Sequence, residues 1–245
     1  MKITQIETIR VKEFPDIIWV QVHTDGGITG LGETWYAASA VQAAVHDHFG
    51  PLLIGRDPAE IEGHWQQMFR LSDHAGYGGA EVRAISALDM ALWDIKGQAL
   101  KMPVFELLGG VTRDKIRVYN TCGVYGDIQD GWDVWRDPVR VAKSLLDEGI
   151  AGLKFSPTDF IARESDGQEL FVEDLDWALT PVRRIRDALG MEMDIANDAH
   201  AKWNLAQAVR IVHAFEPYRL MWHEELVPAF NEEAHRRLQA ETRTP

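Results

Sequence analysis

Two short stretches of the sequence combine residue types that can bind a cation and move a proton. The first is Asn-Asp-Ala-His at 197–200, and the second is His-Glu-Glu at 223–225. Each follows a run typical of a buried strand, 191–196 in the first case and 219–222 in the second. Carboxylate oxygens are preferred ligands of hard divalent cations, and an imidazole beside them is a candidate acid or base. The alternative interpretation is a polar strand-to-helix loop in which the aspartate caps a helix.

The residues between these stretches indicate how the two are brought together. A helical pattern covers 203–215, so the order is strand, helix, strand, which predicts parallel neighbouring strands. Their carboxyl ends would then deliver Asp198, His200 and Glu224 to one edge of the sheet. Side-chain alternation along a strand predicts that Asp198 and His200 share a face. The same alternation turns His223 away from Glu224, which favours a structural role for His223.

Composition narrows the class of protein. The chain has 245 residues, enough for one large domain or two modest ones, and is 46% hydrophobic and 26% charged, as is typical of a soluble globular protein. A formal net charge of −13 argues against a nucleic-acid or anionic-membrane partner. The single cysteine, Cys122, excludes an internal disulfide and favours a reducing, cytoplasmic location. The sequence shows neither a signal peptide nor an apolar run of membrane-spanning length.

Residues 1–114 are predicted to form an α+β domain that begins with an antiparallel meander. The predicted strands are 3–11, 17–23 and 28–33, with a hairpin turn signal at 24–27. Gly30 and Gly32 in the third strand allow another backbone to approach closely. Helical patterns follow, one of them starting at Asp57. The strongest helical pattern covers 80–100, where apolar residues recur at three- and four-residue steps.

Three residues of this first domain are candidates for contact with a substrate. Trp35 and Tyr36 follow the third strand in a predicted loop, where aromatic rings could cover a ligand or instead pack within their own domain. His74 adjoins a glycine-rich segment, 75–79, that is either a lid or a connector. We keep these three as a possible substrate loop, although for His74 a role outside the site is favoured.

From residue 115 the pattern changes to an alternation of strands and helices. The predicted strands are 116–121, 152–156, 191–196 and 219–222, and the predicted helices are 138–148, 175–189, 203–215 and 231–241. Such alternation predicts a parallel sheet with helices outside it, here about four strand–helix units over 115–245. Two long connectors, 123–137 and 157–174, follow strand carboxyl ends, where α/β folds place their sites.

Five motifs in order carry a resemblance to a known family. They are TDGGITGLGET at 24–34, ALDMALWDIKG at 87–97, PVFELLGG at 103–110, DAH at 198–200 and HEEL at 223–226. On these motifs the sequence resembles the enolase superfamily, in its mandelate racemase and muconate lactonizing enzyme-like group, and specifically the galactonate- and mannonate-type sugar-acid dehydratases. The resemblance implies an α+β capping domain followed by a TIM β/α barrel, which would be partial here.

The resemblance also implies site residues. It implies an essential Mg²⁺ held by acidic residues on three barrel strands, of which Asp198 matches the first and Glu224 the second. Glu225 is expected beside the ligands rather than among them. His200 matches a catalytic acid/base. Lys154 matches the first lysine of the racemase Lys-x-Lys motif, and is either a contact to the substrate carboxylate or a solvated loop lysine.

The chemistry expected from this resemblance is dehydration of a small acid sugar. Removal of the proton α to a carboxylate gives an enediolate, whose charge a divalent cation offsets, and histidine can exchange protons near neutral pH. A racemase or epimerase is the alternative within the superfamily, but Ser156 occupies the second lysine position of the racemase motif. We also expect a homo-oligomer.

The end of the sequence limits these expectations. It stops before the family's fifth strand, so the third metal ligand and the later catalytic residues have no position in it. We therefore expect a truncated product with weak metal binding, little activity of its own and a bare edge on the fourth strand. The third alternative function is accordingly an inactive fragment or an assembly module.

Overall fold

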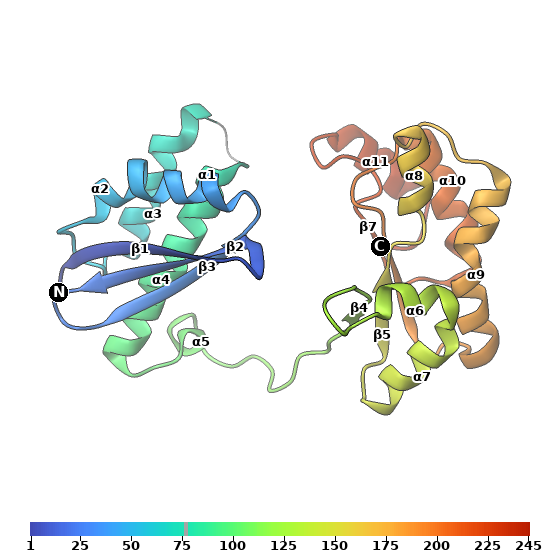
Figure 1. Ribbon diagram of the computed structural model, residues 1–245, viewed down its shortest axis with the longest axis horizontal. Helices are drawn as coiled ribbons and strands as arrows, with labels where there is room; N and C mark the ends of the chain where they lie inside the picture. The colour runs from blue at the N-terminus through green and yellow to red at the C-terminus, as the bar shows by residue number, and fades with distance from the viewer. Residues whose placement is uncertain (76–77) are drawn as a thin grey trace. The chain divides into compact units, whose positions relative to one another are not determined.

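The chain divides into two compact units, which are described separately below. The computed structural model describes residues 1–75 and 78–245, and the units are Met1–Asp114 and Lys115–Pro245 (Figure 1). The first unit begins with an antiparallel sheet in the order β1-β2-β3. Its strands are β1 (Ile3–Val11), β2 (Phe14–Thr24) and β3 (Thr29–Trp35). The predicted meander is confirmed.

Helices follow the meander in the first unit. They are α1 (Ala38–Ala43), a π-helical segment (Ala44–Phe49), α2 (Gly50–Leu53), α3 (Ile61–Ser72), a 3₁₀ turn (Asp73–Ala75), α4 (Ala80–Leu100) and α5 (Val104–Leu107). The helix predicted to start at Asp57 instead starts at Ile61. Asp57 Oδ1 accepts a hydrogen bond from the Ala59 amide, 3.0 Å away, in the turn before the helix.

Helix α4 packs directly on the backbone of β3, as the two strand glycines suggested. A Cβ atom built on Gly32 would lie 1.8 Å from the Ala87 carbonyl oxygen, and one on Gly30 would lie 2.0 Å from the Ala91 carbonyl oxygen. Those distances are far below van der Waals contact, and the obstructing atoms are backbone. Only glycine permits this helix-on-strand packing.

Replacing Gly32 by alanine should therefore destabilise the first unit. Overpacking of a tight contact costs about 1–3 kcal/mol, and here the helix backbone must move because no flexible side chain can yield. Urea unfolding followed by circular dichroism measures the loss. Gly63→Ala is the matched control, because Gly63 lies inside α3 with open space around it, and it should stabilise by about 0.5–1 kcal/mol. Equal stability of the Gly32→Ala protein and the wild type would contradict this packing argument.

The second unit contains a four-stranded sheet in the order β4-β5-β6-β7, and its paired strands run parallel. The strands are β4 (Asn120–Thr121), β5 (Gly152–Phe155), β6 (Asp194–Asp198) and β7 (His223–Glu224). The helices are α6 (Asp130–Arg136), α7 (Pro138–Asp147), α8 (Asp159–Ser165), α9 (Val172–Leu189), α10 (Leu205–Phe215), a 3₁₀ turn (Glu216–Tyr218) and α11 (Glu232–Ala240). The predicted partial β/α barrel is confirmed.

Two differences from the predicted elements matter for the site. Both long connectors contain a short helix, α6 in the first and α8 in the second, and Val134 and Ile161 of these helices are buried. The third strand begins and ends later than predicted, so Asn197 and Asp198 belong to β6 itself. The outer edge of β7 is not bare at His223, whose amide donates to the Pro245 carbonyl, 2.9 Å away.

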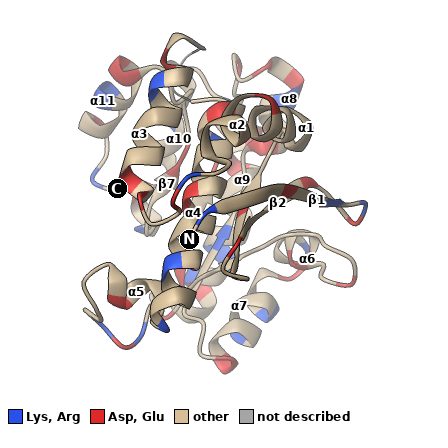
Figure 2. Ribbon diagram, turned by 90° about the vertical axis from the view of Figure 1, so that its left-hand side faces the viewer, with Lys and Arg blue, Asp and Glu red and all other residues tan. Residues whose placement is uncertain are grey.

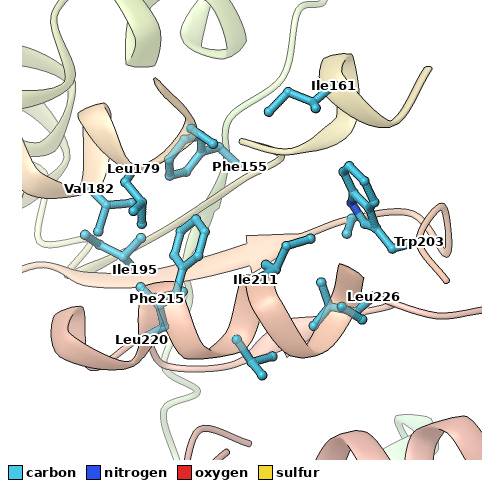
Figure 3. Close-up of a cluster of buried hydrophobic side chains, with 14 of the residues drawn as sticks. Phe155, Ile161, Leu179, Val182, Ile195, Trp203, Ile211, Phe215, Leu220 and Leu226 are labelled. Atoms are coloured by element: carbon cyan, nitrogen blue, oxygen red, sulfur yellow. The ribbon is translucent and has the colours of Figure 1, made fainter. Parts of the chain in front are cut away.

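The core of the second unit lies between the sheet and its helices. Phe155 and Ile195 come from β5 and β6, and they pack with side chains of α9 and α10 such as Val182 and Phe215 (Figure 3). Trp203, 1% exposed, lies at one end of this cluster with Ile161 of α8 (Figure 3). The loop that follows β6 is therefore anchored in the core by its own tryptophan.

Charged residues of both signs are distributed over the described part of the chain. Acidic and basic residues are interspersed along the helices of each unit (Figure 2). Within the described ranges no helix combines the length and apolar character needed to cross a membrane.

Candidate metal and catalytic site

Two carboxylates converge on one point at the carboxyl edge of the second unit's sheet. Asp198 ends β6 and Glu224 ends β7, and the two are register partners in the parallel pair. Asp198 Oδ2 and Glu224 Oε1 each lie 2.8 Å from the Nζ atom of Lys154 on β5. Because both oxygens reach the same atom, a single cation can contact both carboxylates.

Lys154 is the cation that lies between them. The residue is 8% exposed, so the alternative of a solvated loop lysine is wrong. Burial by itself lowers the pKa of Lys154, but the hydrogen bonds to Asp198 and Glu224 outweigh burial and hold that pKa above its ordinary value. The side chain is therefore an ammonium ion, and it marks a position of strongly negative potential.

The donor set at this position fits a hard divalent cation such as Mg²⁺. The other oxygen of each carboxylate is held from outside: Trp222 Nε1 donates to Glu224 Oε2 at 3.0 Å, and the His200 amide donates to Asp198 Oδ1 at 3.2 Å. The remaining oxygen of each carboxylate, which here accepts a hydrogen bond from Lys154, is aimed at the shared point, and oxygen ligands are what Mg²⁺ prefers. Among residues 1–75 and 78–245, no cluster of three or more His, Cys, Asp or Glu side chains could hold a metal ion.

His200 lies beside Asp198, but not through side-chain alternation along one strand, which was the expected reason. Strand β6 ends at Asp198, and His200 has a φ of 47°, so strand alternation does not apply to it. Its Nε2 atom lies 3.7 Å from Asp198 Oδ2, and its side chain is 54% exposed. The imidazole is thus adjacent to the carboxylate pair and open to a substrate.

The loop that carries His200 is held by the last residue of β7 and the residue that follows it. The Ala199 amide donates to the Glu224 carbonyl at 3.0 Å, and the Ala201 amide donates to the Glu225 carbonyl. His200, Ala201 and Glu225 all have positive φ values, of 47°, 57° and 47°. Non-glycine residues in this region are strained, and such strain is often found at functional sites. Glu225 supports the loop through its main chain while its side chain is exposed, so its expected place beside the metal ligands stays a prediction.

Sequence reasoning missed a fifth residue of this cluster, Asp159. It is the first residue of α8 and is buried, and its Oδ2 atom lies 2.9 Å from His200 Nδ1. Lys202 Nζ donates to the same oxygen. The available signal was its location, in a connector that follows the carboxyl end of β5.

His223 is directed away from the site, as alternation predicted. Its Nδ1 atom lies 3.1 Å from Asn197 Nδ2, and its ring packs edge-on against Phe215. Burial lowers the pKa of His223 to about 4, so the ring is neutral near pH 7. These contacts fit the expected structural role.

The three candidates for a substrate loop lie in the first unit. Trp35 is the last residue of β3 rather than a loop residue, because it still pairs with Ile17 of β2, and Tyr36 follows it with a φ of 71°. Their rings touch, with centroids 4.2 Å apart, and both are about half exposed. His74 is exposed in a 3₁₀ turn. Part of the adjoining glycine-rich segment, 76–77, lies outside the described residues. A substrate role for the three stays a prediction.

Two family models match the chain over most of its length. The mandelate racemase / muconate lactonizing enzyme N-terminal domain matches residues 5–109, and the enolase C-terminal domain-like model matches residues 137–245. The chain therefore belongs to the enolase superfamily, in its mandelate racemase and muconate lactonizing enzyme group.

Individual relatives narrow the comparison. D-galactonate dehydratase of Variovorax paradoxus (strain S110) is 39% identical, covering 100% of this chain and 60% of the relative. D-galactonate dehydratase of Klebsiella pneumoniae (strain 342) is 36% identical with the same coverage. The crystal structure of an enolase of the mandelate racemase subgroup from Agrobacterium tumefaciens superposes with a TM-score of 0.89 at 41% identity, over 100% of this chain and 63% of that one. The chain thus spans about three fifths of these relatives' length.

Proposed function

We propose that this chain contributes to a Mg²⁺-dependent dehydratase of acid sugars, with a substrate of the D-galactonate type. The observation that carries the proposal is the convergence of the Asp198 and Glu224 carboxylates on one cationic position with the His200 imidazole beside it. The dehydratase names of the relatives support the reaction class.

Asp198 and Glu224 are the residues that would hold Mg²⁺. Bound there, Mg²⁺ would act as a Lewis acid that offsets the charge developing on a substrate carboxylate when its α-proton leaves. Both carboxylates have one oxygen fixed by a hydrogen bond from Trp222 or the His200 amide, so the other oxygen of each, which now contacts Lys154, is already oriented toward the cation position.

His200 is the proposed acid/base. Dehydration removes the α-proton and the β-hydroxyl as water, and the enol that remains tautomerises to a 2-keto-3-deoxy acid. His200 can accept or return one of the protons, since its ring is exposed and borders the carboxylate pair. Lys154 is the proposed contact to the substrate carboxylate, because it already binds carboxylates as a cation.

A dehydratase is favoured over a racemase by the residue two positions after Lys154. A racemase of this type uses a second lysine base there, and this chain has Ser156, whose hydroxyl is a poor base. Ser156 lies just beyond β5, in a cavity shared with Cys122, Trp132 and Phe160.

The test is an assay for the 2-keto-3-deoxy product. The 245-residue chain and a hybrid that adds the unmatched part of the Variovorax paradoxus relative are each incubated with D-galactonate and Mg²⁺. The hybrid should form the keto acid, and chelation should abolish its activity. The chain alone should be far less active, because its described residues supply two converging carboxylates only. Epimerisation of the substrate without keto-acid formation by the hybrid would refute the dehydratase assignment.

A further inference from the structure

The Asp159 carboxylate faces Nδ1 of the His200 ring. Asp159 is the first residue of α8, where an aspartate commonly accepts hydrogen bonds from the amides of its own helix. In the described part of the chain, the hydrogen bonds that this carboxylate accepts come instead from His200 Nδ1, at 2.9 Å, and from Lys202 Nζ. Its contacts are therefore with the loop that carries His200.

These contacts determine which ring nitrogen carries the proton. An ionised carboxylate is only an acceptor, so Nδ1 of His200 must be the donor in this hydrogen bond. The ammonium group of Lys202, which can only donate, is bonded to the same oxygen, so Oδ2 acts as an acceptor there. A neutral imidazole with its proton on Nδ1 has its lone pair on Nε2. Nε2 is also the atom that lies toward Asp198, 3.7 Å from Oδ2.

We propose that Asp159 is a positioning residue, which holds His200 in the Nδ1–H tautomer and so makes Nε2 the atom that transfers the proton. The catalytic part of this statement rests on the proposed function. The tautomer and its cause rest on the geometry of the Asp159–His200 hydrogen bond alone.

Neighbouring contacts fix the start of α8 against the His200 loop. Trp203 Nε1 donates to Thr158 Oγ1 at 3.2 Å, and both residues are fully buried. After α8, a Cβ atom on Gly167 would lie 1.7 Å from the Lys202 carbonyl oxygen, so the two backbones meet directly. The helix and the loop thus contact each other on both sides of the Asp159–His200 bond. These contacts fix the orientation of the His200 ring.

The second oxygen of Asp159 indicates that the residue is not placed for stability. Oδ1 is buried and has no hydrogen-bond partner within the described residues. An unpaired buried oxygen disfavours the folded state. An aspartate kept at such a position is better explained by what its other oxygen does to His200.

The proposal is tested by nitrogen NMR of the histidine rings in the 245-residue chain, which requires no turnover. The rings are labelled with ¹⁵N, the spectrum is recorded at alkaline pH where imidazoles are neutral, and the His200 signals are assigned as those lost in His200→Asn. Wild-type His200 should show the Nδ1–H pattern. Asp159→Asn should shift the population toward Nε2–H, because an amide can donate to Nδ1 as well as accept from it.

Two further variants separate Asp159 from its surroundings. Lys202→Met should leave His200 in the Nδ1–H form, since Asp159 still accepts the bond. Asp166→Asn, an exposed change at the other end of α8, should change nothing. Wild-type His200 in the Nε2–H form would overturn the proposal whether or not the Asp159 variant folds. An unchanged tautomer in a folded Asp159→Asn protein would overturn it as well.

A kinetic measurement connects the tautomer to the chemistry. In the hybrid enzyme, Asp159→Asn should lower kcat by about 10²-fold while KM changes little, since general acid–base catalysis is lost and substrate binding is not. A rise in KM with unchanged kcat would assign Asp159 to substrate binding and refute the positioning role. An inactive wild-type hybrid would refute the proposed function and leave the tautomer result standing.

Discussion

Replacing His200 by asparagine should lower kcat for dehydration by about 10²–10⁴-fold, the usual contribution of a general acid or base. Asparagine keeps the polarity and the backbone amide that donates to Asp198 Oδ1, but it cannot carry a transferable proton. Mg²⁺ affinity should therefore stay unchanged. Turnover is measured in the hybrid enzyme, and Mg²⁺ binding is measured by calorimetry in the same preparation.

Two controls sharpen this expectation. His213→Asn makes the same replacement on α10 at a histidine side chain that is also 54% exposed, and it should retain activity. Asp198→Asn and Glu224→Gln should show the opposite pattern from His200→Asn, with Mg²⁺ affinity strongly reduced. Substantial turnover by the His200→Asn enzyme, or loss of Mg²⁺ binding equal to that of Asp198→Asn, would remove His200 from the proposed role.

Much of the fold follows from local sequence patterns. The spacing of apolar residues predicted α4 with its observed ends, Ala80–Leu100, and Thr24–Gly27 predicted the hairpin that joins β2 and β3. The strand–helix–strand order predicted the parallel pairing that brings Asp198 beside Glu224. These features depend on periodicity and connectivity, which a single sequence carries in full.

The geometry around His200 was harder to predict from the sequence. Alternation placed His200 on the face of Asp198, but the strand ends one residue after Asn197, and the loop then adopts left-handed conformations at His200 and Ala201. Non-glycine residues rarely take that conformation, so the sequence offers no local signal for it. The loop in this conformation is held by backbone hydrogen bonds to Glu224, at the end of β7, and to Glu225.

Asp159 and Lys154 show a second limit of prediction from the sequence, which is that contacts between distant segments have no local signal. Asp159 is separated from His200 by 41 positions, and only the packing of α8 on the loop brings them together. Lys154 was predictable as a polar residue on β5, but not as a buried one, because lysine is seldom buried unless it is paired. Its partners come from two other strands, so its environment is a property of the sheet rather than of its own segment.

The buried ion pairs of Lys154 predict a large loss of stability when this lysine is replaced. Replacing Lys154 by methionine should destabilise the metal-free protein by about 3–5 kcal/mol, since removal of one partner leaves an uncompensated buried charge. Asp198 would bear most of this cost, because its side chain is 7% exposed while that of Glu224 is 35% exposed. Methionine has a similar length and no charge, so the change isolates the ammonium group.

Magnesium should reverse that loss if Asp198 and Glu224 form its site. A cation that binds only the folded protein stabilises it in proportion to the logarithm of its concentration relative to its Kd. In the wild type the ammonium group already lies between the carboxylates and opposes a second cation by charge repulsion. The Lys154→Met protein should therefore gain more stability from Mg²⁺ than the wild type does, and should bind it more tightly.

Urea unfolding with and without Mg²⁺ measures both effects on the 245-residue chain. Lys143→Met, the same replacement at an exposed position on α7, should change stability by less than about 0.5 kcal/mol and should leave the response to Mg²⁺ as in the wild type. Adding Asp198→Asn to Lys154→Met should remove the extra response, because one of the two converging carboxylates is then neutral. If Mg²⁺ stabilised the wild type and the Lys154→Met protein equally, the cation would bind elsewhere, and the assignment of Asp198 and Glu224 as metal ligands would be wrong.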